Sequence, residues 1–403
     1  MEYQQLISLA EKYGSPLYIY DAEKIISQFK HIKNAFADSK RLRINFATKA
    51  LSNISVLKLL KNIGSNIDCV SIEEVQLGLL AGFDPKQISF TPSGVSFEEI
   101  EKAVDLGVKI TLDNLPVLDR FGANYPDLPV SIRINPNVMG GGNEKISVGH
   151  HKAKFGIPTY QIDDVKQIER KRKMRINGVH MHTGSDILKV ETFLEAAEVL
   201  FGVARQFENL SFIDFGGGFK VSYKEGDPAT DLEEFGTIIS KRFNEFSKEY
   251  GKELEIVFEP GKFLVSESGY FLTSVNLIKK TDKITFAAVN TGFNHFIRPM
   301  YYGAYHHIVN ISNPEGELKK YNVVGYICET DTFAEDRMIS EIHAGDLLCF
   351  KNAGAYSFTM ASNYNSRLRP AEVLVYKGKD HLIRERETLD DLTRNQIITD
   401  IDL

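Results

Sequence analysis

The sequence predicts an α/β protein with a (β/α)₈ TIM-type barrel and a second, mostly antiparallel β-domain. In the first two-thirds of the 403 residues, short apolar β-branched runs alternate with amphipathic stretches, and this alternation repeats eight times. After about Phe263 the strand-like runs continue, but long helical periods are few. The length suits one very large or two ordinary domains, and a hydrophobic share of 43% is enough for full cores.

Eight runs are predicted as barrel strands: 41–47, 66–71, 87–91, 108–113, 129–135, 176–183, 210–215 and 254–259. Amphipathic helices are predicted between them, for example over 54–61, 73–81, 98–105 and 190–207. The barrel domain is therefore predicted over 21–263. The β-domain is predicted over 1–20 and 264–403, because the strand-like run 16–20 could pair with the later runs at 270–278, 284–289, 321–328, 346–350 and 372–376.

Charge and cysteine content limit the possible functions. A net charge of −6, with no basic block, argues against a general nucleic-acid binder. No run reaches the roughly 18 apolar residues of a membrane span, and the N-terminal residues lack the features of a signal peptide. Three cysteines, an odd and sparse number, favour a reducing compartment. We therefore expect a cytoplasmic protein without nucleic-acid or membrane partners.

Two predicted strands end where side chains are absent or small. The run 210–215 closes on the triplet Gly216–Gly218, and the run 254–258 ends in Glu259–Gly261. Bare backbone N–H groups can close on a phosphate, and the last two strands of a barrel are where this fold usually holds one. The pair predicts a phosphorylated ligand.

Lys49 follows the first predicted strand. A lysine just past a buried strand is partly desolvated, so its amine can be neutral, nucleophilic and able to form a Schiff base with an aldehyde. The alternative is an ordinary surface lysine in a loop, and position alone gives both interpretations similar weight.

The sixth predicted strand carries His180 and His182, which strand alternation places on the same inward face. One interpretation is a zinc pair. A second is an imidazole stacked on a flat cofactor, with Ser185 donating to a phosphate, and a third is a pair of hydrogen-bonded core histidines. The zinc interpretation needs further ligands, but the sequence offers only glycines after the seventh strand and a single acid, Glu259, after the eighth.

Glu259 could cap a turn or pair with a lysine. A carboxylate beside a pyridine nitrogen instead favours the protonated ring, which draws electrons from the carbanion that decarboxylation creates. A phosphate cradle, a Schiff-base lysine, a ring-facing histidine and an acidic partner at four strand ends together predict pyridoxal 5′-phosphate.

The second domain has its own cluster of polar residues. Arg298 is followed by several tyrosines, and a guanidinium can hold a substrate carboxylate bidentately. A predicted strand then ends in Cys328 and Glu329, and Tyr356 follows later. Taken singly, these residues favour plainer roles: a small buried hydrophobe for Cys328 and a surface ion pair for Arg298.

In this order, the motifs resemble the fold-type-III pyridoxal-phosphate decarboxylases. The resemblance covers nearly the whole chain, and the segments that carry it are 16–18, 46–50, 180–185, 216–218, 259–262, 298–302, 328–331 and 369–372. It implies these cofactor contacts: Lys49 as Schiff-base lysine, His182 stacked on the ring, Glu259 at the ring nitrogen, and Ser185, Gly217, Gly218, Gly261, Lys262 and Tyr356. It implies these substrate contacts: Lys262, Arg298, Tyr302, Glu329 and Tyr356.

The resemblance also implies that Cys328 returns a proton to the α-carbon. In this family, Cys328 and Glu329 reach into the partner subunit's site, so a homodimer with shared active sites is implied. Two positions depart from the family pattern: Lys262 stands where many members have Arg, and Phe90–Gly94 stands where relatives often show a His-Gly-Asn type turn. Lys keeps the charge but loses the bidentate fork.

The segment 143–156 resembles the specificity loop of the branch that acts on diaminopimelate. A distal amino acid needs a cation as well as carboxylates in the pocket, and Arg298 supplies one. The resemblance therefore implies decarboxylation of meso-2,6-diaminopimelate at its D-centre to L-lysine and CO₂, the last step of lysine biosynthesis. The alternatives are a decarboxylase of carboxynorspermidine, ornithine or another basic amino acid, a metal-dependent barrel hydrolase, and a cofactor-binding regulator without turnover.

Overall fold

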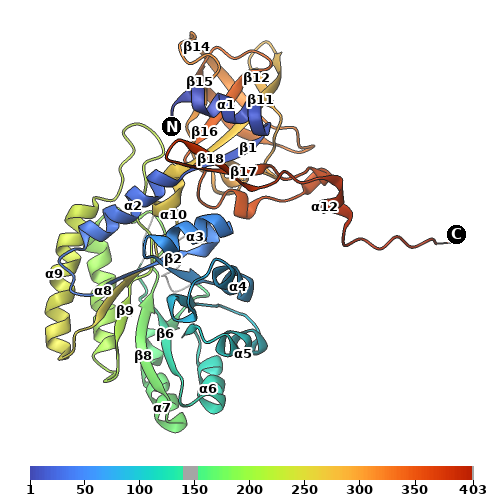
Figure 1. The fold of residues 1–403 in the computed structure, drawn as a ribbon. Helices are drawn as coiled ribbons and strands as arrows, with labels where there is room; N and C mark the ends of the chain where they lie inside the picture. The colour runs from blue at the N-terminus through green and yellow to red at the C-terminus, as the bar shows by residue number, and fades with distance from the viewer. Residues whose placement is uncertain (139–152, 402–403) are drawn as a thin grey trace. The chain divides into compact units, whose positions relative to one another are not determined.

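The computed structural model describes residues 1–138 and 153–401 (Figure 1). The chain divides into two compact units. The barrel unit comprises Lys24–Ser222 and Gly226–Val265, and the β unit comprises Met1–Glu23, Tyr223–Glu225 and Ser266–Leu403. Among the described residues, no helix has the length and apolar character needed to cross a membrane.

The barrel unit contains a closed barrel of eight parallel strands, which confirms the predicted fold class. The strands are β2 (Leu42–Ala47), β3 (Asn66–Cys69), β4 (Ile88–Phe90), β5 (Lys109–Leu112), β6 (Pro129–Asn135), β8 (Arg175–Met181), β9 (Phe212–Asp214) and β10 (Glu255–Phe258). Neighbours in the barrel follow chain order, and β10 pairs with β2 to close it. The short strand β7 (Ile157–Pro158) adds to β6.

Helices follow the barrel strands, and several begin at a residue that caps them. The helices are α2 (Ala22–Ala35), α3 (Ile54–Asn62), α4 (Ile72–Leu80), α5 (Phe97–Asp105), α6 (Leu115–Asn124), α7 (Ile162–Arg172), α8 (Val190–Ala204), α9 (Leu232–Tyr250) and α10 (Lys262–Val265). Asn53, Ser71 and Asp231 accept backbone N–H groups of the first turns of α3, α4 and α9. These bonds satisfy donors that a helix start leaves unpaired.

Apolar packing in this unit lies mainly between strands and helices, where phenylalanine rings meet. The rings of Phe36 and Phe258 pack at a tilt with centroids 4.3 Å apart, and those of Phe193 and Phe235 pack edge to face at 4.7 Å. Other strand residues are polar and buried: Asn45, Asp68, Ser89, Thr111, Ser131, Arg133, His180 and Asp214. Because strand residues alternate between faces, these side chains share the inward face of the barrel. The fold therefore supplies a polar interior in which charged groups act on one another.

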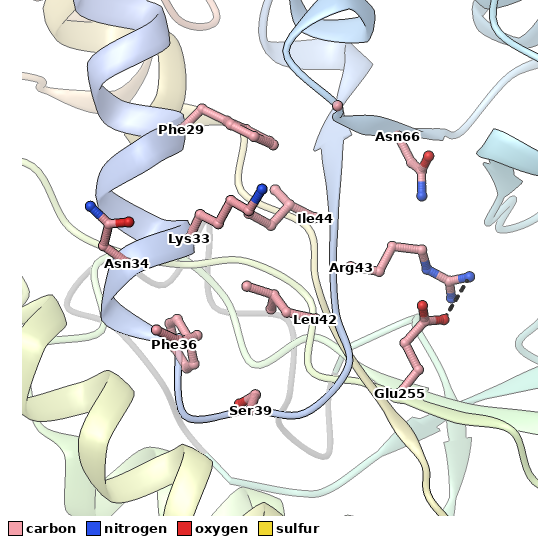
Figure 2. Close-up of a pocket in the computed structure, with 12 residues that line it drawn as sticks. Phe29, Lys33, Asn34, Phe36, Ser39, Leu42, Arg43, Ile44, Asn66 and Glu255 are labelled. Atoms are coloured by element: carbon pink, nitrogen blue, oxygen red, sulfur yellow. Dashed lines mark ion pairs between the residues drawn. The ribbon is translucent and has the colours of Figure 1, made fainter.

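A cavity of about 550 Å³ lies beside the starts of β2, β3 and β10 (Figure 2). Its walls include Leu42 and Ile44, and Figure 2 shows the Arg43 guanidinium turned towards Glu255, with 3.1 Å between Nη1 and Oε2. Active sites of such barrels lie at the opposite, C-terminal ends of the strands. We therefore interpret this cavity as part of the structural end of the barrel.

The β unit contains a nine-stranded, mostly antiparallel sheet. Its strands are β1 (Leu17–Asp21), β11 (Gly269–Lys280), β12 (Thr285–Val289), β13 (Ile308–Asn310), β14 (Leu318–Val324), β15 (Thr332–Ser340), β16 (Leu347–Lys351), β17 (Ala371–Tyr376) and β18 (Lys379–Arg384). As predicted, the run at 16–20 pairs with later strands: β1 lies between β11 and β17. Helix α1 (Tyr3–Tyr13) covers one face, where Leu6 and Leu9 join the core of the sheet.

The strand predicted over 321–328 ends earlier than expected, so Cys328 and Glu329 do not lie at a strand end. Strand β14 stops at Val324, and the following residues bend around Asp331. The Asp331 carboxylate accepts the N–H groups of Ile327 at 3.0 Å and Phe293 at 2.7 Å. These bonds replace strand pairing and fix the bend that carries Cys328.

Candidate active site

Lys49 lies directly after β2, in a single 3₁₀ turn over Thr48–Ala50. Its ammonium lowers the pKa of Asp68 on β3 and of Glu259 after β10, so its charge acts at the C-terminal ends of both neighbouring strands. The side chain is exposed in this chain, which corrects the prediction of a partly desolvated amine. Carboxylates rather than burial therefore set the environment of this amine.

Glu259 is the first residue after β10 and is buried. Burial, and after it Asp68, raise the pKa of its carboxyl, whereas Lys49 and Arg133 lower it, and the net pKa is about 8. Its Oε2 lies 3.0 Å from Nε2 of His180. Burial lowers the pKa of His180 to about 4, so this imidazole is neutral. Since its Nδ1 is buried without a partner, the fitting tautomer carries the hydrogen on Nε2 and donates it to Glu259.

His182 lies just beyond β8 and has a different partner from His180. Its Nδ1 accepts the N–H of Gly217 at 3.3 Å. Burial lowers the pKa of His182 well below its ordinary value, and Arg133 and Lys49 add to the effect, so this imidazole is also neutral. The structure thus ties His182 to the glycine triplet and His180 to Glu259.

The zinc pair considered for His180 and His182 is not what the structure builds. Within the described ranges, the group with metal-ligating geometry is His180, Asp214 and Glu259, whose ligand atoms lie within 4.8 Å of one another. His182 is not a member. The sequence reasoning also missed Asp214, which ends β9 two residues before Gly216 and was treated as part of an apolar strand. The feature that could have identified Asp214 is its position within a predicted buried strand, where an unpaired carboxylate costs folding free energy.

The triplet Gly216–Gly218 forms a close-packed loop with room only for backbone. Gly216 and Gly218 have φ values of +68° and +121°. A Cβ at Gly217 would meet the Glu259 carbonyl oxygen at 2.4 Å, and one at Gly218 would meet the Gly184 carbonyl oxygen at 2.5 Å. Only glycine fits such positions, and the bare backbone they leave is what a phosphate cradle requires.

The loop after β8 runs against this triplet and carries Ser185 and Asp186. Ile187 N–H donates to the Gly218 carbonyl at 2.9 Å, which holds the two loops together. Lys262, which opens α10 directly after Gly261, is buried, and its Nζ lies 2.5 Å from Oδ1 of Asp186. Asp186 was not predicted from sequence. The Asp186 carboxylate pairs with the single charge of Lys262, at a position where many members of the family that the sequence resembles have the forked guanidinium of Arg.

Arg298 begins α11 (Arg298–Tyr302) in the β unit and is only 7% exposed. Its Nε donates to Nε2 of His306 and its Nη2 to the Tyr223 hydroxyl, both at 3.3 Å, and the Tyr302 ring lies 5.6 Å away. In the part of the chain that the structure describes, no carboxylate lies within ion-pair distance of this guanidinium. The surface ion pair considered from sequence is therefore wrong, and the charge remains available for an acidic ligand.

Cys328 and Glu329 are exposed in the bend after β14. The Tyr364 hydroxyl donates to Oε1 of Glu329, and Nδ2 of Asn365 lies 3.2 Å from Sγ of Cys328. Cys328 is therefore not the buried hydrophobe considered from sequence. The two other cysteines do fit that description: Cys69 and Cys349 are buried, and burial raises the pKa of each thiol.

Tyr356 lies half-buried in the β unit with a φ of +54°. Most of the segment proposed as a specificity loop, residues 143–152, lies outside the described residues. The remaining predicted cofactor residues lie in the barrel unit after β2, β8, β9 and β10, and the predicted substrate residues Arg298, Tyr302 and Glu329 lie in the β unit.

Comparisons with known proteins show the family to which the chain belongs. Residues 22–266 match the model of a family described as pyridoxal-dependent decarboxylase, pyridoxal binding domain. The chain is 40% identical over 400 residues to a diaminopimelate decarboxylase of Methanothermobacter thermautotrophicus, and the match covers 97% of this chain and 93% of the relative. A diaminopimelate decarboxylase of Campylobacter jejuni is 35% identical, and 97% of each chain is covered.

Solved structures similar to this chain include decarboxylases as well. A crystal structure of diaminopimelate decarboxylase from Helicobacter pylori complexed with L-lysine matches with a TM-score of 0.89 and 35% identity, covering 96% of this chain and 98% of that one. A lysine/ornithine decarboxylase of Vibrio vulnificus complexed with putrescine matches with a TM-score of 0.81 and 23% identity, over 93% and 98% of the two chains. At that identity the likeness concerns the fold alone.

Proposed function

The chain belongs to the family of pyridoxal-dependent decarboxylases, and we propose that it removes the carboxylate at the D-configured centre of meso-2,6-diaminopimelate to give L-lysine and CO₂. This reaction is the last step of lysine biosynthesis. The observation that carries the proposal is 40% identity to a diaminopimelate decarboxylase over 97% of the chain.

Pyridoxal 5′-phosphate is the cofactor. When bound, it supplies a cationic ring that accepts the electron pair left behind by the departing CO₂. The residues present fit it: the glycine triplet offers bare backbone where a Cβ would clash, and Lys49 acts electrostatically on Glu259. The residues that would hold the cofactor are Lys49, His182, Ser185, Gly217, Gly218, Glu259, Gly261, Lys262 and Tyr356.

In this proposal the barrel residues hold and orient the cofactor and polarise its ring. Lys49 would hold the cofactor through its aldehyde group. Glu259 would lie beside the ring nitrogen, where a carboxylate favours the protonated ring. His182, whose Nδ1 accepts the Gly217 N–H, would contact the ring. Lys262 supplies positive charge beside the phosphate loop.

Residues of the β unit recognise the distal end of the substrate and return a proton. Arg298 binds the distal carboxylate, because its guanidinium is buried and has neutral hydrogen-bond partners. Tyr302 and Tyr356 line the same pocket in this proposal, and Glu329 binds the distal ammonium. Cys328 donates a proton to the α-carbon after CO₂ has left.

We also propose a homodimer with shared active sites. Cys328 and Glu329 are exposed, yet side chains of Asn365 and Tyr364 hold them in place. An ordered thiol and carboxylate that face solvent suit a role in a partner subunit's site. The barrel domain, 21–263, would carry the cofactor, and 1–20 with 264–403 would supply substrate and dimer contacts in a cytoplasmic enzyme.

The test is direct turnover by the purified protein loaded with pyridoxal 5′-phosphate. We expect equimolar L-lysine and CO₂ from meso-diaminopimelate, and little product from D,D-diaminopimelate, L,L-diaminopimelate, ornithine or carboxynorspermidine. Faster turnover of ornithine or carboxynorspermidine would assign the chain to another basic amino acid.

A further inference from the structure

Asp214 connects the two parts of the barrel site that handle the two ends of the cofactor. It is the last residue of β9 and is 3% exposed. Its Oδ1 accepts the N–H of Gly216 at 2.9 Å, and the carbonyl of Gly216 in turn accepts the N–H of Glu259 at 2.7 Å. The first glycine of the phosphate loop is thus held by the Asp214 side chain on one side and the Glu259 backbone on the other.

Asp214 also meets Glu259 through its side chain. His180, Asp214 and Glu259 each place one polar atom within 4.8 Å of the other two, and all three residues are buried. A hydrogen bond from Asp214 lowers the pKa of Glu259. Two buried carboxyl groups at this distance cannot both ionise, because the interior does not screen like charges. His180 cannot neutralise them, since burial keeps its imidazole uncharged.

The charges that face each carboxyl group decide which one keeps the proton. Glu259 is faced by the cations Lys49 and Arg133, by the anion Asp68 and by the Nε2 hydrogen of His180. Asp214 is faced by Glu259, by neutral His180, by the Gly216 N–H and by the cations Arg43, Lys109 and Arg133. Arg43 is already paired with Glu255 (Figure 2). Lys109 also faces Glu255, and Arg133 faces both carboxyl groups. The Lys49 charge and the Nε2 hydrogen of His180 therefore favour ionisation of Glu259, so the proton stays on Asp214.

We propose that Asp214 is a positioning residue that works as a neutral carboxylic acid, donating a hydrogen bond to Glu259 and accepting one from Gly216. Glu259 is then the member of the pair that ionises against the cofactor's ring nitrogen. The pKa of Asp214, raised well above its ordinary value by burial and by Glu259, agrees with this assignment. The inference rests on the proposed function, because the ring nitrogen belongs to its cofactor.

Because Asp214 is assigned as a neutral acid, asparagine, whose amide has nearly the same shape, should be able to take its place and make both hydrogen bonds. In Asp214→Asn, Nδ2 can donate to Glu259 while Oδ1 still accepts the Gly216 N–H. Asp214→Leu fills similar space but makes neither bond. We expect Asp214→Asn to bind pyridoxal 5′-phosphate and turn over within about threefold of wild type, and Asp214→Leu to bind the cofactor at least about tenfold more weakly. Glu259→Gln, the matched exchange at the partner that must ionise, should lose most of kcat.

Infrared spectroscopy of the cofactor-free protein tests the protonation state without any turnover. Above pH 8 Glu259 is ionised, so we expect wild type to keep a protonated-carboxyl band at pH 9 that is absent from Asp214→Asn and present in Glu259→Gln. This readout stays valid if Asp214→Leu does not fold. It also separates the two proposals, because the band tests Asp214 even if wild type makes no lysine. Absence of the band, or an Asn variant as impaired in cofactor affinity as a folded Leu variant, would overturn the assignment.

Discussion

The ammonium of Lys262 and the carboxylate of Asp186 lie 2.5 Å apart, joining the loop after β8 to the start of α10. Lys262 is buried and Asp186 is about a quarter exposed. A lysine at this position offers one point charge, so the carboxylate and a phosphate compete for it. We therefore propose that this pair sets how strongly the cofactor phosphate is held.

Removing either partner of this pair should have opposite effects on cofactor binding. Lys262→Met deletes the cation, and we expect at least a tenfold weaker affinity for pyridoxal 5′-phosphate, in line with the loss of one charge-assisted hydrogen bond of about 1.5–3 kcal/mol. Asp186→Asn frees the ammonium, so affinity should stay equal or rise. Cofactor titration by absorbance measures both. If Asp186→Asn bound the cofactor as weakly as Lys262→Met, the ion pair rather than the lysine charge alone would be what cofactor binding requires.

Arg298 should discriminate substrates by their second carboxylate. We expect Arg298→Ala to reduce kcat/KM for meso-diaminopimelate by roughly 30- to 1000-fold, since a bidentate charged contact of about 2–4 kcal/mol is lost. D-lysine, which lacks that carboxylate, should lose far less. His306→Gln serves as the control, because it alters a neighbour of the guanidinium without removing the charge. Equal losses for both substrates would contradict the role.

Asn365 should support the thiol that returns the proton. Its backbone φ is +56°, a conformation that glycine adopts without strain. Asn365→Gly therefore deletes the amide beside Cys328 while sparing the backbone, and we expect about a tenfold lower kcat with little change in KM. Asn365→Ala adds backbone strain and should also lower the melting temperature. A Gly variant with unchanged kcat would remove Asn365 from the proton step.

The cofactor-free protein should lose stability as the pH rises from about 5 to 8. The pKa of Glu259 is raised to about 8 in the folded chain from an ordinary value of 4.5, so within this window the folded protein holds a proton that the unfolded chain has lost. Its contribution is present below pH 4.5 and disappears as the pH passes 8, with a slope of up to about 1.4 kcal/mol per pH unit. Urea titrations at several pH values measure the slope, and Glu259→Gln should flatten it. An unchanged slope in that variant would place the titration elsewhere.

The barrel could be predicted strand by strand because buried β-branched runs alternate with amphipathic helices. Strands β13, β15 and β18 were missed. In β15 the exposed residues Glu335 and Asp336 interrupt the apolar pattern. The early end of β14 was missed because it depends on Asp331 reaching back to two backbone N–H groups, which no local pattern reveals.

The predicted site residues are individually present, but their partners were less accessible to sequence reasoning. Asp214 and Asp186 act through contacts made between loops of different strands, and each stands beside a motif that drew the interpretation instead. Lys49 was predicted to be partly desolvated and is exposed, and its charge still lowers the pKa of buried Glu259.

We propose that Lys49 holds pyridoxal 5′-phosphate while the enzyme makes lysine from diaminopimelate. Borohydride reduction of the loaded enzyme, followed by peptide mapping, tests this role of Lys49. We expect one pyridoxyl group per chain on the peptide that contains Lys49, and none in Lys49→Ala. A label on the peptide of Lys262, the buried lysine beside the phosphate loop, or no label at all, would contradict it.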